Sequence, residues 1–201
     1  MPDIVPCYDS LDDSHIKRVM GKKQTTSDTK VACYKKLGFD GIPAKTKTFE
    51  KESKLGNKGR LTMIDEWNRI YIYTEKHIKF YSNGAMSTEE FPSFKWPDPE
   101  RQERYDEVRE TVKLAGRGLA VIGVVGGPFE RSVLGWGFTR FLSILLKGNR
   151  IALKHMEKVG DYWIRVGRIE IETGVDAIMI TDDYAFKHGP FFSPKLFRDA
   201  I

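Results

Sequence analysis

Two continuous runs of apolar residues stand out along the chain, and each ends where glycine or polar residues begin. Leu119–Val125 (LAVIGVV) and Val175–Ile180 (VDAIMI) lack the regular alternation that half-exposed strands show. Such runs are typical of strands that are covered on both faces in a parallel sheet. We therefore predict two buried strands here, and a third, shorter strand at Phe39–Pro43.

Stretches with helical spacing separate these strands. Asp98 followed by Pro99 predicts a helix start, because Asp is a good N-cap and Pro suits the first helical position. Gly38 fits the position just after a helix end. A last helix is expected to begin at Pro194, capped by Ser193. The helices expected before it are Ser14–Met20, Asp28–Leu37, Pro99–Ala115, Ser132–Lys147 and Arg150–Thr173.

Residues 69–87 carry a different pattern. Arg69–Thr74 (RIYIYT) and His77–Tyr81 (HIKFY) alternate along the chain, which indicates strands with one exposed face. Ser82-Asn83-Gly84 follows, and Asn-Gly favours a type I′ turn. We expect a small antiparallel β-hairpin excursion here, preceded by a loop over residues 44–60.

Buried strands that alternate with helices indicate a βα-repeating fold. A closed (β/α)8 barrel needs eight strands and about 250 residues, whereas this chain offers three such strands at most. The predicted fold class is therefore α/β, a partial (β/α)8 TIM barrel with the hairpin excursion near residues 69–87. Residues 1–27 are expected to form an irregular N-terminal segment, and residues 28–201 the N-terminal part of a barrel truncated at its C-terminus.

Composition narrows the class of function. The chain has 201 residues and a net charge of +5, but its 33 Lys and Arg are interleaved with 28 Asp and Glu. A nucleic-acid surface would cluster the positive charge, so no nucleic-acid partner is expected. The densest basic stretch, Lys45–Arg60, also carries glutamates and is interpreted as a solvated loop.

The cysteines and the apolar zones indicate the cellular compartment that we expect for the protein. Cys7 and Cys33 show neither metal-ligand spacing nor a disulfide framework, so we interpret them as reduced thiols of a cytoplasmic protein. The most apolar zone, Gly118–Leu146, is interrupted by charged residues. No run of about 20 apolar residues exists, and no membrane helix is expected.

The end of the first buried strand is one candidate site. In parallel βα folds, ligands bind at the C-terminal ends of strands. Gly126 and Gly127 would let backbone approach a ligand closely, and the following Pro128 and Phe129 would border it, with Phe129 stacking on a planar group. The alternative is a tight strand-to-helix turn that needs glycine for its geometry alone.

The end of the second buried strand is the other candidate site. Asp182 and Asp183 follow it directly, with Tyr184 next. A carboxylate there can accept hydrogen bonds, hold a cation or move a proton. Adjacent side chains of an extended backbone point in different directions, so one aspartate would meet the ligand while the other caps the loop or pairs with a base. The alternative is that both are solvated residues or helix caps. His188 completes no recognisable metal-ligand pattern, and no metal is expected.

At the level of motifs, Gly174–Ile201 (GVDAIMITDDYAFKHGPFFSPKLFRDAI) resembles the uroporphyrinogen decarboxylase superfamily. In that superfamily a strand ending in acidic residues leads into a loop and an S-P-x-x-F helix start. Gly123–Phe129 (GVVGGPF) looks like the preceding strand and its Gly-x-Pro-aromatic turn. Leu37–Pro43 and Asp65–Tyr71 are similar to the methyltransferase-like members. The resemblance implies a (β/α)8 barrel whose active site lies at the strand ends.

The resemblance points to one branch of the superfamily more than the other. The decarboxylases use an R-Q-A-G-R loop for substrate carboxylates, and this chain has none. It also carries Leu134 and Asp183 where that branch has Tyr and Ser. The other branch comprises corrinoid-dependent methyltransferases, which use zinc bound by a His-x-Cys…Cys cluster. That zinc is expected in a missing C-terminal half, and no cofactor is expected in this chain.

The sequence thus leads to a functional hypothesis with named residues. We expect part of an enzyme that handles a tetrapyrrole or a corrinoid protein in methyl transfer. The catalytic residues would be Asp182 and Asp183, and the substrate-binding residues would be Gly126, Gly127, Pro128, Phe129 and Tyr184. Two alternatives stay open: a carboxy-lyase of porphyrin biosynthesis acting on uroporphyrinogen, and an inert fragment whose uncovered sheet edge drives homo-oligomerisation.

Overall fold

The computed structural model describes residues 5–55, 61–73 and 79–201. Their contacts group them into two compact units. The first unit comprises the chain up to Lys47 together with Glu100–Val125 and Arg165–Ile180. The second unit comprises Thr48–Pro99, Gly126–Ile164 and Thr181–Ile201.

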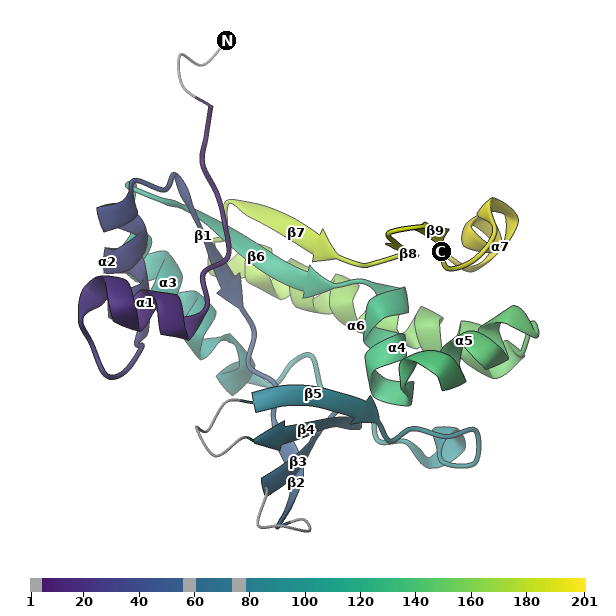
Figure 1. Ribbon diagram of the computed structural model, residues 1–201. Helices are drawn as coiled ribbons and strands as arrows, with labels where there is room; N and C mark the ends of the chain where they lie inside the picture. The colour runs from purple at the N-terminus through teal and green to yellow at the C-terminus, as the bar shows by residue number, and fades with distance from the viewer. Residues whose placement is uncertain (1–4, 56–60, 74–78) are drawn as a thin grey trace. The chain divides into compact units, whose positions relative to one another are not determined.

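The first unit is built on a three-stranded sheet, as the apolar runs predict. Its strand order is β1-β6-β7, with β1 and β6 paired in parallel. The arrows of β6 and β7 run in the same direction (Figure 1). The central strand β6 is buried along most of its length, in agreement with its unbroken apolar sequence. The strands are β1 (Gly41–Lys45), β6 (Ala120–Gly126) and β7 (Ala177–Thr181).

The burial predicted for β7 is wrong. Ile180 is 68% exposed, and every residue of this strand is either exposed or half-buried. The physical reason is the position of β7 in the sheet, since it is the edge strand of the described sheet and only β6 pairs with it.

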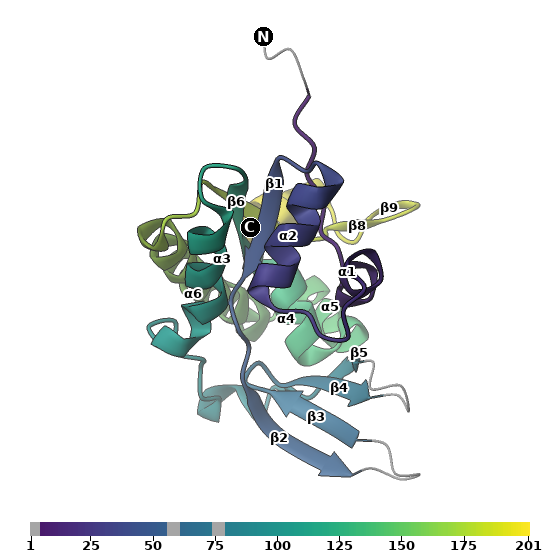
Figure 2. The ribbon, with the colours of Figure 1, turned by 90° about the vertical axis from the view of Figure 1, so that its left-hand side faces the viewer.

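Helices α2 and α3 pack against β1 and enclose an apolar core (Figure 2). Tyr34 of α2, Val108 of α3 and Val121 of β6 meet in this core. Gly38 adopts a left-handed conformation (φ 74°) after α2, which confirms its predicted place after the helix end. The helices of this part of the chain are α1 (Asp13–Met20), α2 (Ser27–Leu37) and α3 (Asp106–Ala115).

The start predicted for α3 is wrong by several residues. A 3-10 helix at Gln102–Tyr105 precedes α3, although Asp98 and Pro99 look like a helix start. Arg104 is buried, and its guanidinium donates to the backbone oxygen of Lys47 at 2.8 Å. This tertiary contact fixes the chain where the sequence alone favours an earlier α-helical turn.

The second unit contains a larger antiparallel excursion than expected. Four strands pair in the order β2-β3-β4-β5, so part of the predicted loop at residues 44–60 is strand. The pairing of β4 with β5 confirms the predicted hairpin, whereas its expected residue His77 lies outside the described residues. The strands are β2 (Glu50–Leu55), β3 (Leu61–Asp65), β4 (Arg69–Tyr73) and β5 (Lys79–Gly84).

Asn83-Gly84 is not the turn that its sequence suggests, because both residues pair within β5. A β-bulge lies opposite Ile70 and Tyr71, where the register shifts. A Cβ atom on Gly84 would overlap the backbone of Gly135. Glycine is therefore required here for the close approach of a strand to a helix.

The helices of the second unit enclose its main core, which includes Phe129, Trp136, Phe141 and Met156. The single helix predicted for Ser132–Lys147 is two helices. The first begins early, with Pro128 in its first turn, and Gly137 (φ 86°) separates it from the second. They are followed by α6, which has the predicted bounds. The helices are α4 (Pro128–Trp136), α5 (Phe138–Leu146) and α6 (Arg150–Thr173), the last of which continues into the first unit.

A short hairpin and helix end the described chain. The strands β8 (Ala185–Phe186) and β9 (Gly189–Pro190) pair antiparallel, and α7 (Pro194–Ala200) follows. Ser193 caps α7 as predicted, since its hydroxyl accepts from the backbone nitrogen of Leu196. None of the helices that the structure describes combines the length and apolar character needed to cross a membrane.

Candidate active site at the ends of β6 and β7

The ends of β6 and β7 lie side by side. The backbone N–H of Gly127 donates to the backbone oxygen of Thr181 at 2.7 Å. The glycine turn after one strand and the aspartate pair after the other are therefore neighbours. This adjacency is the geometry on which the sequence-based site depends.

Asp182 holds the first turn of α4. Its two carboxylate oxygens accept from the backbone N–H groups of Phe129 at 3.1 Å and Glu130 at 2.5 Å. Gly127, at the N-cap position of α4, has no side chain that could do this. A carboxylate at a helix N-terminus satisfies free N–H groups and meets the positive end of the helix dipole. Asp182 therefore acts as a helix cap, which is one of the alternatives that the sequence left open for it.

The two glycines face protein side chains. A Cβ atom on Gly126 would overlap the Arg131 side chain, and one on Gly127 would overlap Asp182. The close approach that glycine permits is thus between the turn and these two residues, as in the structural alternative for this turn.

Pro128 and Phe129 also differ from the expectation of a ligand-facing edge. Pro128 occupies the first turn of α4. Phe129 is 1% exposed and packs against other aromatic rings of the core, with Phe192 at a centroid distance of 5.0 Å. The stacking of Phe129 on a ligand is therefore corrected to a role in the core.

Asp183 and Tyr184 leave the strand end in different environments. Asp183 is exposed, and Tyr184 is half-buried. Burial raises the pKa of Tyr184, and the hydrogen bond and negative charge of Asp182 raise this pKa further. The phenol therefore stays protonated and tied to the aspartate that caps α4.

Two residues that the sequence reasoning did not select, Glu130 and Arg131, lie at the same strand ends. The Arg131 guanidinium lies over the ring of Trp163, 5.4 Å from its centre, and reaches the Thr181 hydroxyl at 3.4 Å. Its Nε is buried without a hydrogen-bond partner among the described residues, and the nearest Glu130 oxygen is 4.0 Å away. Both side chains keep some exposure, 22% for Arg131 and 28% for Glu130. A ligand at the strand ends can therefore reach both groups.

Strand β4 brings a second arginine towards this cluster. The Nε of Arg69 donates to Asp65 at 2.7 Å in a buried ion pair, and its guanidinium lies 5.7 Å from the centre of the Tyr71 ring. Arg69 also acts electrostatically on Glu130 and Arg131. Its close ion pair with Asp65 leaves Arg131 as the arginine better placed to meet a ligand.

The charges of this cluster shift its ionisation. Burial raises the pKa of Glu130, Arg131 lowers it, and the carboxylates of Asp183 and Asp182 raise it again. Burial lowers the pKa of Arg131, although Glu130 opposes that shift. The cluster therefore offers a charged donor, a carboxyl group with a raised pKa and an exposed carboxylate, which can exchange hydrogen bonds and protons with a ligand.

A sequence signal for the missed residues existed. Glu130 and Arg131 are two of the three charges, with Arg140, that interrupt the most apolar zone of the chain, and they lie in the first turn after a buried strand. Charged side chains at that position are costly to bury unless a partner or ligand meets them.

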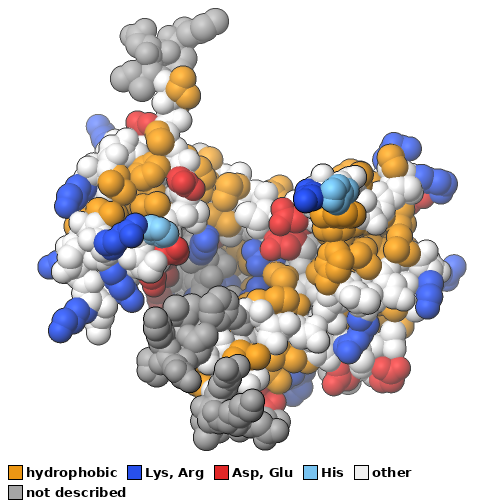
Figure 3. All heavy atoms as spheres, in the orientation of Figure 1, with side chains coloured by type: hydrophobic (Ala, Val, Ile, Leu, Met, Phe, Trp, Pro, Cys, Tyr) orange, Lys and Arg blue, Asp and Glu red, His pale blue; other side chains and the backbone are white. Residues whose placement is uncertain are grey.

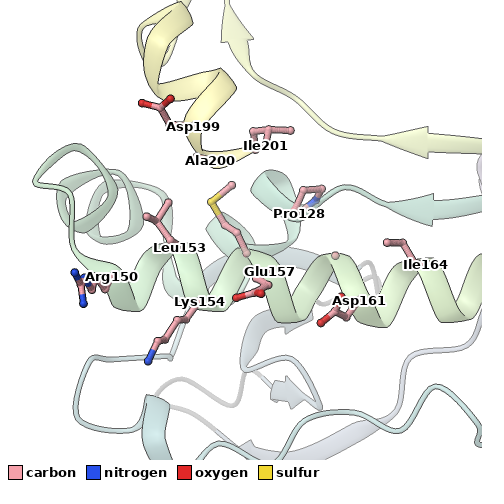
Figure 4. Close-up of a pocket in the computed structure, with 12 residues that line it drawn as sticks. Pro128, Arg150, Leu153, Lys154, Glu157, Asp161, Ile164, Asp199, Ala200 and Ile201 are labelled. Carbon is pink, nitrogen blue, oxygen red and sulfur yellow. The ribbon is translucent and has the colours of Figure 1, made fainter.

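A different pocket of about 520 Å³ lies between α6 and α7. Leu153 and Ile164 point from α6 towards α7, whereas Lys154, Glu157 and Asp161 point away from it (Figure 4). Binding sites usually combine an apolar wall with a few converging polar groups. This pocket lacks that convergence, so we favour the strand ends as the candidate site.

His188 and the two aspartates were the residues considered as possible metal ligands. His188 is exposed, and its ring contacts Phe186 at a centroid distance of 6.1 Å. Across the part of the chain that the structure describes, no three His, Cys, Asp or Glu side chains are grouped so that they could hold a metal ion.

The chain belongs to the uroporphyrinogen decarboxylase (URO-D) family, whose profile matches residues 71–201. This match confirms the resemblance seen in the strand-end motifs. A search of curated proteins found no match.

A solved structure, described as a methyltransferase from Methanosarcina mazei, shares the fold with a TM-score of 0.65. The two sequences are 16% identical, and the match covers 98% of this chain and 59% of that chain. The chain thus spans about three fifths of the length of that structure. The likeness confirms the α/β class and fits a part of a barrel.

Proposed function

We propose that this chain is part of a methyltransferase-like enzyme of the URO-D family that binds a corrinoid at the ends of β6 and β7. The observation that carries the proposal is the charge balance of the strand-end cluster. Three carboxylates, Glu130, Asp182 and Asp183, lie near two arginines, and Arg69 is already in a close ion pair with Asp65.

This balance suits one class of tetrapyrrole better than the other. The rim of a corrinoid carries carboxamides, which both donate and accept hydrogen bonds. Arg131 can donate to an amide oxygen, and Glu130 and Asp183 can accept from an amide nitrogen. Uroporphyrinogen carries carboxylates on its side chains, and these would be repelled by the acidic residues.

The residues take separate roles in this proposal. Asp182 positions the start of α4 through its contacts with Phe129 and Glu130. Glu130 and Arg131 would then meet the ligand directly. The zinc ligands that the family resemblance implies are not found among the described residues, and no step of the proposal goes through zinc.

A comparison of two ligands tests the proposal. Hydroxocobalamin serves as the corrinoid and uroporphyrin as the stable polycarboxylate, and each is titrated against the chain by its absorption spectrum. We expect saturable binding of hydroxocobalamin at least about tenfold tighter than that of uroporphyrin. Tighter binding of uroporphyrin would favour the decarboxylase alternative, and binding of neither would favour the inert fragment.

The methyl-transfer step requires a test of its own. Methylcobalamin is incubated with the chain and a small thiol, and the appearance of the demethylated cobalamin spectrum is followed. We expect the thiol sulfur to take the methyl group and release its proton to solvent, while the electron pair of the broken carbon–cobalt bond stays on cobalt and cob(I)alamin leaves. A rate equal to that without protein would contradict the transfer activity while leaving corrinoid binding to the first experiment.

A further inference from the structure

The segment after the aspartate pair forms an aromatic pocket separate from the strand-end cluster. This pocket has a volume of about 300 Å³, which is at the small end of the range for ligand sites. Its lining includes Tyr184, Phe192, Phe197, Pro190, Pro194 and Arg198. The hairpin β8–β9 and helix α7 therefore supply the walls.

The aromatic walls hold one another in place. The rings of Tyr184 and Phe197 meet edge to face, with centroids 5.0 Å apart and planes at 87°. Phe192 lies at 6.3 Å from both of these rings. Edge-to-face packing of this kind is a favourable geometry that an added aromatic ring can extend.

Apolar surface remains uncovered around this pocket. Phe197 is 38% exposed, and Phe186 on the neighbouring strand β8 is 55% exposed. Hydrophobic side chains gather on the surface around the β8–β9 hairpin (Figure 3). A contiguous exposed patch of aromatic residues is a common mark of a binding surface.

The positive charge of Arg198 beside the aromatic rings favours a ligand that carries a negative charge. Arg198 contributes to the lining and makes no ion pair with any residue that the structure describes. Lys195 on the same helix is held by Asp199 at 2.8 Å and is thus engaged. A guanidinium without a partner matches a planar carboxylate in geometry and charge.

We propose that this pocket binds a small aromatic carboxylate, with the ring against Tyr184, Phe192 and Phe197 and the carboxylate against Arg198. The volume fits one substituted ring rather than a tetrapyrrole. Tyr184 also hydrogen-bonds Asp182, so the ligand would lie against the segment that leads away from the strand ends. The binding itself requires no corrinoid, so its outcome is independent of the proposed function.

The test compares two ligands and two variants. Benzoate and benzamide share the ring and differ in charge, and their dissociation constants are measured by ligand-observed NMR titration of the 201-residue chain. We expect benzoate to bind at least about tenfold more tightly than benzamide. Arg198→Gln should bring benzoate to the affinity of benzamide, whereas Lys195→Gln should leave it within about twofold.

Three results would overturn the proposal. The first is equal affinity of benzoate and benzamide, and the second is an equal effect of the two substitutions. The third comes from sedimentation velocity, if the chain self-associates and Phe197→Ser, with an unchanged far-ultraviolet circular dichroism spectrum, abolishes the association. In that case a second copy of this chain, rather than a small ligand, covers the aromatic surface.

Discussion

The carboxylate of Asp182 lies 2.5 Å from the backbone nitrogen of Glu130, although the two residues are 52 positions apart in the sequence. This contact ties the end of β7 to the first turn of α4. It makes Asp182 a structural anchor at the edge of the site, and it fixes the position of the helical turn that carries Glu130 and Arg131.

Loss of the Asp182 carboxylate should weaken α4. We expect Asp182→Ala to lower the free energy of unfolding by about 1–2 kcal/mol, because two N–H groups lose a charged acceptor. Asp183→Ala is the matched control and should change it by less than about 0.5 kcal/mol, since this side chain is exposed. Urea denaturation measures both. Equal effects of the two substitutions would contradict the capping role.

The turn glycines should not tolerate a side chain. Gly127→Ala is expected to destabilise the chain by about 1–3 kcal/mol, because its Cβ would overlap Asp182. Gly160→Ala within α6 is the control, since a Cβ there would meet open space. This control should stabilise by about 0.5–1 kcal/mol through helix propensity. Thermal unfolding of both variants checks the prediction, and a stabilised Gly127→Ala would refute it.

Glu170 should make stability fall as the pH rises. It is fully buried against Gly123 of β6, and burial raises its pKa to about 7. The same carboxyl helps to raise the pKa of the neighbouring Tyr105, which is already raised by burial. Because the folded pKa exceeds the unfolded one, the unfolded state releases the proton first. The free energy of unfolding then falls between about pH 4.5 and pH 7, by about 3 kcal/mol.

Glu170→Gln tests this prediction because an amide does not ionise. Chemical denaturation of the variant from pH 4.5 to 8 should lack the decline that the unmodified chain shows. Exposed Glu172, two residues along the same helix, provides the matched substitution Glu172→Gln, which should keep the decline. A decline of the same size in both variants would exclude Glu170 as its source.

His155 should act at the acidic end of the pH range. Its ring lies in the core of the second unit, with Nδ1 2.9 Å from the Ser132 hydroxyl. That hydroxyl donates its proton to the backbone oxygen of Pro128, so it accepts from Nδ1. Burial lowers the pKa of His155 to about 3. Between these two pKa values the histidine is protonated in the unfolded state and neutral in the folded state. The free energy of unfolding therefore decreases as the pH falls below about 6.5 towards 3.

Nuclear magnetic resonance can follow this histidine directly. We expect the imidazole signals of His155 to stay those of a neutral ring from pH 8 down to pH 5. A titration of this ring near pH 6.5 in the folded protein would show that it is not enclosed as described.

Helix caps, apolar stripes and continuous apolar runs in the sequence correctly predicted several elements of the fold. The helix α6 begins at Arg150 and ends at Thr173 as its apolar stripe indicates. Ser193 caps α7, and β6 is the buried central strand. These features depend on neighbours within a few residues, or on an apolar run that only a covered strand explains.

Tertiary contacts account for the parts that could not be predicted. Gly84 looks like a turn residue, but a strand passes close to Gly135 there. Arg104 holds a 3-10 turn through the backbone of Lys47. Gly135 and Lys47 are distant from these residues in the sequence. The local patterns therefore predicted a turn at Gly84 and an early start of the helix, and both predictions were wrong.

The candidate site shows the same division. The adjacency of the two strand ends followed from the fold class, since parallel strands end at one edge of a sheet. The roles of the residues within the site could not be predicted in this way. The Asp182 carboxylate accepts hydrogen bonds from the first turn of α4, and Phe129 is buried in the core. Glu130 and Arg131 take the positions that a ligand can reach.

The most direct test of the account is the affinity of Arg131→Gln for hydroxocobalamin, measured by spectral titration beside Arg150→Gln. Arg150 lines the pocket between α6 and α7, so its variant controls for binding there. We predict that Arg131→Gln raises the dissociation constant by about tenfold or more, while Arg150→Gln leaves it within about twofold. An unchanged dissociation constant in Arg131→Gln, with weakened binding in Arg150→Gln, would place the ligand away from the ends of β6 and β7.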